Sequence, residues 1–215
     1  MKADVASRAQ AISGEIREWR RDLHRHPELG FDLPYTTEFV LTKLRTFGYQ
    51  PRRVGKAGIA ATVGKPGKTF LLRADMDALP MKEESGEPFA SQNGCMHACG
   101  HDMHTASLLA AAKMLKERED ELCGTVMLVF QPCEERMHGA QQMLQDGLFE
   151  NGKPDAALAQ HVLRAPTGVA GVRPGFMNGS CDFFKITLTG KGCHGASPES
   201  GVDPIRIAAH VILAL

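Results

Sequence analysis

The apolar positions at the start of the chain recur at the spacing of a helix. They fall three, four or seven residues apart, at Val5, Ile12, Ile16, Trp19 and Leu23. This spacing predicts one helix over residues 4–25, and His26-Pro27 ends it because proline cannot continue a helix. A second helix is predicted at about residues 35–47, and Gly48 supplies the left-handed conformation that commonly ends one.

After residue 50 the pattern changes to short runs of β-forming residues. Ile59–Val63 and Thr69–Ala74 are joined by Gly-Lys-Pro-Gly, which predicts a β-hairpin. The chain then alternates between predicted helices and strands: helix 105–118, strand 125–130, helix 141–145 and strand 156–160. This alternation predicts an α/β fold in which a mostly parallel sheet is flanked by helices.

A second domain is predicted where this alternation stops, near Arg173-Pro174-Gly175. A strand over Cys181–Thr189 and a helix from Asp203-Pro204 follow, so we expect domains at residues 1–176 and 177–215. One strand and one helix cannot bury an apolar face alone, and the last helix reaches Leu215 without a stop signal. We therefore expect the second domain to be incomplete and the chain to be truncated at its C-terminus.

Composition and charge favour a protein that acts on small molecules. Lys+Arg and Asp+Glu both number 25, so there is no net field to attract nucleic acid or an anionic membrane surface. The N-terminus lacks the apolar stretch of a signal peptide, and no apolar run reaches membrane-spanning length. The six cysteines are scattered in a chain that needs no disulfide framework. We expect a cytoplasmic protein with reduced thiols.

Residues with acid–base or metal-binding side chains follow three of the predicted strands. Asp75 and Asp77 come after one strand, Glu134-Glu135 after the next and His161 after a third. Open α/β sheets bind ligands beyond the carboxyl ends of their strands, so these side chains should lie close together.

The segment Cys95–His104 is the densest in metal-binding residue types. It holds two cysteines, three histidines and an aspartate within ten residues. Thiolate and imidazole are ligands that zinc and similar divalent cations prefer, and a carboxylate with a distant histidine would complete such a site. The alternatives are a structural zinc site or a set of buried thiols and histidines. A closed zinc site needs a second ligand pair, and none fits here, so we favour a catalytic site.

Glu134-Glu135 places two carboxylates side by side in the sequence, and the two could have different roles. One can bind a metal, while the other takes a proton from water that the metal activates. This is the logic of metal-assisted amide hydrolysis. Alternatively, both are charges favoured at the N-terminus of a helix.

With these residues in view, the chain resembles the M20 metallopeptidase and aminoacylase family, in the branch that includes hippurate hydrolases and auxin-conjugate hydrolases. The resemblance rests on seven segments: Arg21–Gly30, Leu72–Pro80, Met96–His104, Phe130–Glu135, Asp146–Phe149, His194–Pro198 and Gly201–Ile205. It implies a zinc-peptidase-like catalytic domain at residues 1–176 and the start of an α+β lid or dimerisation domain at 177–215.

The resemblance also implies a role for each candidate residue. The metal ligands would be Cys99, His101, Glu135 and His161. Glu134 would be the general base and acid, and Asp77 would orient a ligand, a task that Asp75 would share. His194, in the lid, would steady the developing oxyanion in an active site, sometimes that of a partner subunit.

The cofactors so implied are a pair of divalent metal ions, with zinc, manganese, nickel and cobalt all open, and the substrates are N-acyl amino acids or small peptides. A homodimer built through the lid would follow. Three places depart from the family pattern: Cys133, Arg136-Met137-His138 and Glu199. A further histidine that completes the metal site in relatives, beyond the lid, is absent.

Three hypotheses remain open at this stage. The first is a metal-dependent amidohydrolase, aminoacylase or carboxypeptidase-like enzyme. The second is a truncated, non-catalytic metal-binding fragment of such an enzyme, and the third is a complete short protein that uses the fold only to bind a metal or ligand. His24 is interpreted as an ordinary helix residue, and His97 and His104 receive no role.

Overall fold

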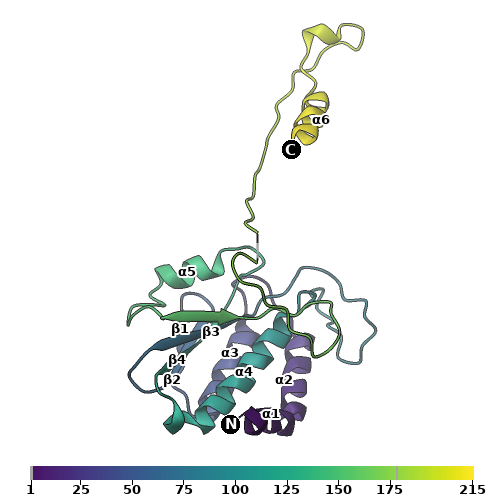
Figure 1. Cartoon of the computed structure of the whole chain (residues 1–215). Helices are drawn as coiled ribbons and strands as arrows, with labels where there is room; N and C mark the ends of the chain where they lie inside the picture. The colour runs from purple at the N-terminus through teal and green to yellow at the C-terminus, as the bar shows by residue number, and fades with distance from the viewer. Residues whose placement is uncertain (1, 178) are drawn as a thin grey trace. The chain divides into compact units, whose positions relative to one another are not determined.

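A five-stranded β-sheet organises the first part of the chain in the computed structural model, which describes residues 2–177 and 179–215. The strands are β1 (Arg52–Val54), β2 (Gly58–Gly64), β3 (Thr69–Asp75), β4 (Thr125–Gln131) and β5 (Ala156–Ala159), in the order β1-β2-β4-β3-β5. β3 pairs in parallel with β4 and β5, whereas β2 pairs antiparallel with β1 and β4. Four strands therefore point the same way and only β2 runs against them (Figure 1).

Helices cover both faces of this sheet and confirm the predicted α/β fold. The helices are α1 (Lys2–Ala11), α2 (Ser13–Arg25), α3 (Pro34–Thr46), α4 (His101–Glu117) and α5 (Gly139–Gln145), with a short 3-10 turn, η1 (Glu119–Glu121). The helices α2, α3 and α4 lie on one face, with α1 against α2 and α4, and α5 lies on the other face (Figure 1).

Two apolar clusters hold the helices to the sheet. In the larger one, Leu109 of α4 packs in the same core as Phe130 of β4, and both are fully buried. In the smaller one, Met143 of α5 packs with Leu71 and Val129 from the opposite face. Successive side chains of a strand point to opposite faces, so β4 contributes to both clusters.

The single helix predicted over residues 4–25 is wrong, because the chain breaks into α1 and α2 at Ile12. Ser13 and Gly14 follow the break, and glycine is a poor helix former. The turn at Ile12 leaves this side chain 1% exposed in the larger cluster. Burial of Ile12 therefore accompanies the loss of helical continuity.

The predicted hairpin between β2 and β3 is also wrong, because β4 lies between the two strands and pairs with both. Gly124 and Gly64 allow the close approach of the connecting loops. A Cβ on Gly124 would lie 2.4 Å from the carbonyl oxygen of Lys68, and one on Gly64 would lie 2.2 Å from the carbonyl oxygen of Gly124. The turn residues predicted correctly that the chain reverses direction between β2 and β3, but they gave no sign that β4 would lie between these two strands.

Residues Ala165–Leu215 form a second compact unit, separate from the first unit, Met1–Arg164. It holds a short 3-10 turn, η2 (Pro198–Ser200), and helix α6 (Pro204–Ala214), which starts where Oδ1 of Asp203 accepts a hydrogen bond from the N–H of Ile205 at 2.9 Å. The boundary predicted at residue 176 falls inside this unit.

The strand predicted at Cys181–Thr189 is not formed in the described part of this unit, so that prediction is wrong. A strand needs a neighbour to pair its backbone N–H and C=O groups, and none of the described residues supplies a ladder there. The only strand-like pairing described in the unit is a bridge between Lys191 and Val202.

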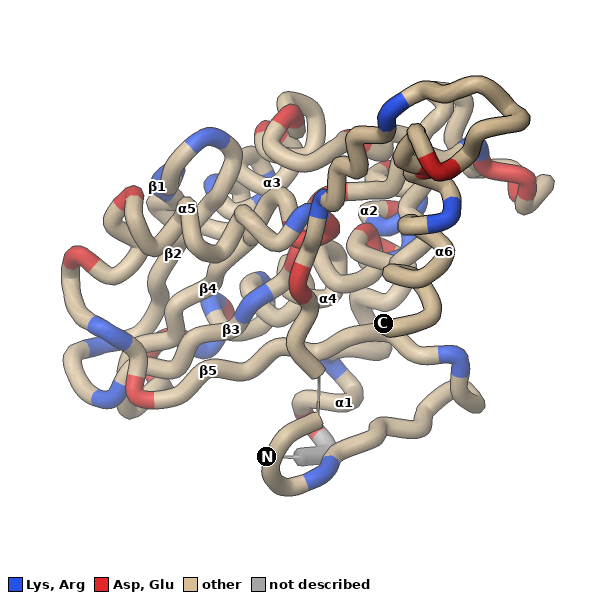
Figure 2. The backbone as a smooth tube through the Cα atoms, turned by 90° about the horizontal axis from the view of Figure 1, so that it is seen from above, with Lys and Arg blue, Asp and Glu red and all other residues tan. Residues whose placement is uncertain are grey.

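Basic and acidic positions are mixed along the first unit, as Figure 2 shows, in keeping with the zero net charge. None of the helices in the described segments combines the length and the apolar character that crossing a bilayer demands.

We expect Leu109→Ala to lower the free energy of unfolding by about 2–5 kcal/mol, because it opens a cavity in the larger core cluster. Leu144→Ala is the matched control, since this leucine also lies on a helix but is 50% exposed. Denaturant titration followed by circular dichroism measures both. Equal losses in the two variants would contradict the placement of Leu109 in the core.

Candidate metal centre

The residues that follow β3, β4 and β5 meet at one edge of the sheet, because these three strands run parallel. Asp75 is the last residue of β3, and Asp77 follows it. Glu134-Glu135 and His161 come shortly after β4 and β5. The structure therefore brings together the side chains that the sequence predicted to converge.

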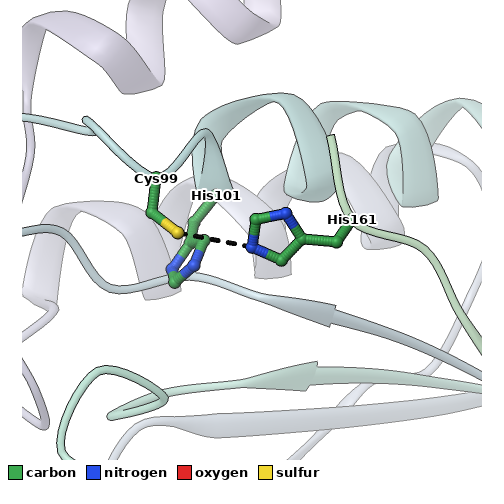
Figure 3. A group of neighbouring side chains, drawn as sticks. All are labelled: Cys99, His101 and His161. Carbon is green, nitrogen blue, oxygen red and sulfur yellow. Dashed lines mark hydrogen bonds between the residues drawn. The ribbon is translucent and has the colours of Figure 1, made fainter. Parts of the chain in front are cut away.

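Cys99, His101 and His161 form one group that could hold a metal ion (Figure 3). The three side chains point toward one another from two segments: the start of α4 with the residues before it, and the segment after β5. Sγ of Cys99 lies 3.3 Å from Nε2 of His161, and the ligand atoms of the group all lie within 4.8 Å of one another. A single ion could contact all three.

His101 also belongs to a second group, with Glu134 and Glu135. Its Nε2 lies 3.8 Å from Oε2 of Glu134 and 3.8 Å from Oε1 of Glu135. Its Nδ1 lies 2.7 Å from the backbone carbonyl oxygen of Asp77. Because a carbonyl only accepts hydrogen bonds, Nδ1 is the donor in this contact, and Nε2 is the ring nitrogen that faces the two carboxylates.

Two atoms of this group are buried without a hydrogen-bond partner among the described residues: Nε2 of His101 and Oε1 of Glu135. Buried polar atoms are normally paired, and both of these are acceptors that a cation would satisfy. Thiolate, imidazole and carboxylate together suit a divalent ion of the zinc type. The residues present therefore fit a divalent metal ion.

Asp77 fixes the loop that carries the two glutamates. Its Oδ1 accepts a hydrogen bond from the N–H of Glu134 at 2.8 Å, and its Oδ2 accepts one from the N–H of Glu135 at 3.2 Å. Cys133, just before them, has a φ of 54°, a left-handed conformation that is costly outside glycine. The strained turn is compatible with these bonds, which hold the backbone of the two glutamates in place beside His101.

His104 ties the segment of His161 to the end of β3. Its Nδ1 lies 2.6 Å from Oδ1 of Asp75, and its Nε2 accepts a hydrogen bond from the N–H of Val162 at 2.9 Å. His161 in turn bonds through Nδ1 to the carbonyl oxygen of Val162 at 2.8 Å. His104 therefore orients the residue next to a candidate ligand.

The charges around the centre favour a bound cation. Burial, together with the carboxylates of Glu135 and Glu134, raises the pKa of the Cys99 thiol to about 11. Burial and the neighbouring Glu134 also raise the pKa of Glu135. Burial alone would raise the pKa of Asp75, but the hydrogen bond from His104 and the nearby His101 and Arg73 lower it to about 2. A divalent ion would relieve the repulsion between the Cys99 thiolate and the neighbouring carboxylates.

His194 lies in the second unit, where it is exposed and its Nδ1 accepts a hydrogen bond from the N–H of Ala196 at 3.1 Å. Its role at an oxyanion stays a prediction. Sequence reasoning missed His104, although it stands three residues after His101 on the same helix, a spacing that puts two side chains on one face. It also missed His24, which is buried between Asp102 and Glu83.

Comparison with known proteins finds one matching family and several similar hydrolases. Residues 71–212 match the family described as Peptidase family M20/M25/M40. The chain is 41% identical over 208 residues to an N-acetyl-L-cysteine deacetylase from Bacillus subtilis (strain 168), covering 91% of this chain and 48% of that protein. It is 41% identical over 211 residues to a hippurate hydrolase from Campylobacter jejuni, covering 95% of this chain and 54% of that one.

A solved structure shows the same resemblance. The crystal structure of a dinuclear metal-binding peptidase of the M20 family from Bacillus subtilis matches with a TM-score of 0.66 and 40% sequence identity, covering 71% of this chain and 43% of that chain. The chain thus spans about half the length of the curated relatives that it matches.

We expect His104→Ala to weaken zinc binding by about 10- to 100-fold, because residues that orient metal ligands typically contribute that much. His210→Ala, an exposed histidine on α6, is the control. Competition with a chromogenic chelator gives the dissociation constants, and near-ultraviolet circular dichroism checks that each variant is folded. A folded His104→Ala protein with unchanged zinc affinity would show that this contact does not support the metal site.

Proposed function

Because the chain belongs to peptidase family M20/M25/M40, we propose that it hydrolyses the amide bond of N-acyl amino acids or small peptides at a divalent metal centre. The observation that carries this proposal is a pair of buried polar atoms, Nε2 of His101 and Oε1 of Glu135, that have no hydrogen-bond partner among the described residues and lie beside a second carboxylate on Glu134. N-acetyl-L-cysteine and hippurate, the compounds in the names of two relatives, are both N-acyl amino acids.

The residues that would hold the metal are Cys99, His101, Glu135 and His161. His101 belongs to both of the groups described above and also to a third, with Asp75 and His104, so it would lie close to each ion of a pair. When bound, a divalent ion supplies positive charge that polarises a substrate carbonyl and makes water more acidic. Zinc, manganese, nickel and cobalt all suit a donor set of thiolate, imidazole and carboxylate.

Glu134 is the proposed general base and general acid. Its side chain is 35% exposed, more than the 23% of Glu135, so it is the more accessible of the two carboxylates. The N–H of Glu134 is held by Asp77, which fixes the backbone while the carboxylate stays free to take a proton from the attacking water. The same carboxylate then returns a proton to the leaving nitrogen.

Asp77 and His194 complete the proposed machinery. Asp77 acts as a positioning residue, through its carboxylate on the glutamate loop and its carbonyl oxygen on His101. His194 would steady the negative charge that develops on the carbonyl oxygen. Residues 1–176 would form the catalytic domain, and residues from 177 onward would belong to a lid through which two copies form a homodimer.

Glu134→Gln is expected to lower kcat for an N-acyl amino acid by about 10²- to 10⁴-fold, because the amide cannot accept the proton. Bound metal per chain should stay unchanged, since Glu134 is not among the proposed ligands. Glu18→Gln, an exposed position on α2, is the matched control. Turnover is measured by release of the free amino acid, and metal by elemental analysis. Undiminished turnover would exclude Glu134 as the base, and loss of metal would make it a ligand instead.

Removal of metal with a chelator should abolish hydrolysis, because the proposed chemistry needs the positive charge of the ion. Hydrolysis should return when zinc, manganese, nickel or cobalt is added back to the metal-free protein, and the ion that restores the highest rate is the preferred one. Cys99→Ser, which replaces the soft thiolate ligand, should shift this preference away from zinc and toward manganese. Hydrolysis that persists in the metal-free protein would contradict a metal-dependent mechanism.

A further inference from the structure

A buried group of charged side chains lies close to the proposed metal centre and has no role in the proposed mechanism. His24 of α2 is at its middle, between Asp102 at the start of α4 and Glu83 in the loop between β3 and α4. The side chain of His24 is 5% exposed, and those of Glu83 and Asp102 are fully buried. Because buried charges need partners, these bonds hold three separate segments of the chain together.

The contacts of His24 are those of a protonated imidazole. Its Nδ1 lies 2.7 Å from Oδ2 of Asp102, and its Nε2 lies 3.0 Å from Oε1 of Glu83. An ionised carboxylate only accepts hydrogen bonds, so both ring nitrogens are donors in these contacts. The bonds to Asp102 and Glu83 raise the pKa of His24 against the opposing effects of burial and of Arg20. Arg20 itself lies 2.7 Å from Oδ2 of Asp102, so two cations face two anions.

Glu83 also organises the loop in which it stands. Its Oε2 accepts a hydrogen bond from the N–H of Ser91 at 2.6 Å, across eight residues of the loop. The loop is closed by Leu79 and Met96, each of which donates its N–H to the carbonyl oxygen of the other at 3.0 Å. The loop is therefore bonded to itself at two places, and His24 bonds it to α2 through Glu83.

Cys99 stands at the junction between this loop and α4. Met96, which closes the loop, is three residues before it, and Asp102 is three residues after it, on the helix. Gly100 begins the helix with a φ of 88°, a left-handed conformation. The position of the Cys99 sulfur therefore depends on how the loop and the helix are set against each other, and His24 is bonded to both.

Stability alone does not account for these charges. A buried ion pair often stabilises a fold no more than apolar side chains of the same volume would. What one ring adds, with a nitrogen on each of two carboxylates, is direction, because both bonds are made in only one arrangement of the loop and the helix.

We infer that His24 is a positioning residue of the metal centre, which sets the loop of residues 76–100 against α4 and so holds the sulfur of Cys99 where it can bind the metal. The inference rests on the proposed metal centre. The described contacts of His24 include none with a proposed ligand, so it acts through Glu83 and Asp102.

Cobalt(II) bound to the full chain gives a readout that a purely structural role would not change, because cobalt held by a thiolate absorbs in the near ultraviolet. The native chain should show this band, and Cys99→Ser should lack it. At saturating cobalt, His24→Gln should lose about half of the band or more, because one amide cannot donate to both carboxylates. Its affinity for cobalt should fall about 10- to 100-fold. A full band in His24→Gln would overturn the inference.

Two further variants serve as controls for the cobalt band. His26→Gln removes a histidine from the same stretch of chain, but its side chain is 44% exposed, so the band should be unchanged. Leu109→Ala lowers the stability of the core and leaves the charged group intact, so it too should keep the full band. Near-ultraviolet circular dichroism of the metal-free proteins checks that each is folded. Equal losses of the band in Leu109→Ala and His24→Gln would overturn the inference, since instability would explain both.

Glu83→Gln keeps the size of the side chain and removes its charge, so it remains a test if His24→Gln does not fold. We expect it to weaken zinc binding about threefold or more and to reduce the cobalt band. In the double variant His24→Gln/Glu83→Gln two amides can bond to each other, so the loss of zinc affinity should be about threefold or more smaller than the product of the single losses. Single losses that simply multiply, or a folded Glu83→Gln with native affinity and a full band, would overturn the inference.

The cobalt band also separates this inference from the proposed function. If the native chain shows no band, or Cys99→Ser keeps it, the proposed metal centre is wrong and the inference falls with it. If the band depends on Cys99 but is the same in the native chain, His24→Gln and Glu83→Gln, the metal centre stands and only the role of His24 is overturned.

Discussion

Asp77 joins the three segments on which the candidate site depends. Its backbone carbonyl oxygen accepts a hydrogen bond from Nδ1 of His101, and its carboxylate accepts hydrogen bonds from the N–H groups of Glu134 and Glu135. A single residue, two positions beyond the end of β3, thus sets the direction of a histidine on α4 and the position of a loop after β4. The bond to His101 is buried and the bonds to the two glutamates are partly buried, where each is stronger than in water and an unpaired group would be costly. The orientation of the His101 ring and the position of the two glutamates both follow from this arrangement.

The parts of the site that the sequence predicted are those whose position follows from strand order. Glu134, Glu135 and His161 stand just beyond predicted strands, and a parallel sheet brings such residues to one edge whatever the intervening loops. The α/β fold was predictable for the same reason, because the period of apolar residues changes between helix and strand. The mixture of residue types predicted a metal site within Cys95–His104, and the resemblance to the M20 family singled out Cys99 and His101 in it.

The features that sequence reasoning missed depend on contacts between distant segments. His104 is bonded to Val162, which is distant from it along the chain. His24 is bonded to Asp102 and Glu83, and both are distant from His24 along the chain. The break at Ile12 reflects burial of one side chain against helices and strands that the local pattern does not include. In each case the local signal was weak, and packing decided the outcome.

The position of β4 has a consequence for how the sheet assembles as the chain is made. β1 and β2 can pair as soon as both exist, since they are neighbours in sequence and in the sheet. β3 has no such neighbour, because both of its partners, β4 and β5, come after α4 in the chain. During synthesis, β3 has no strand to pair with until β4 has left the ribosome. The two strands are separated by a long connection that includes α4, and such non-local pairing is slow. A nascent chain that ends before β4 therefore exposes an unpaired strand, the kind of surface on which chaperones act.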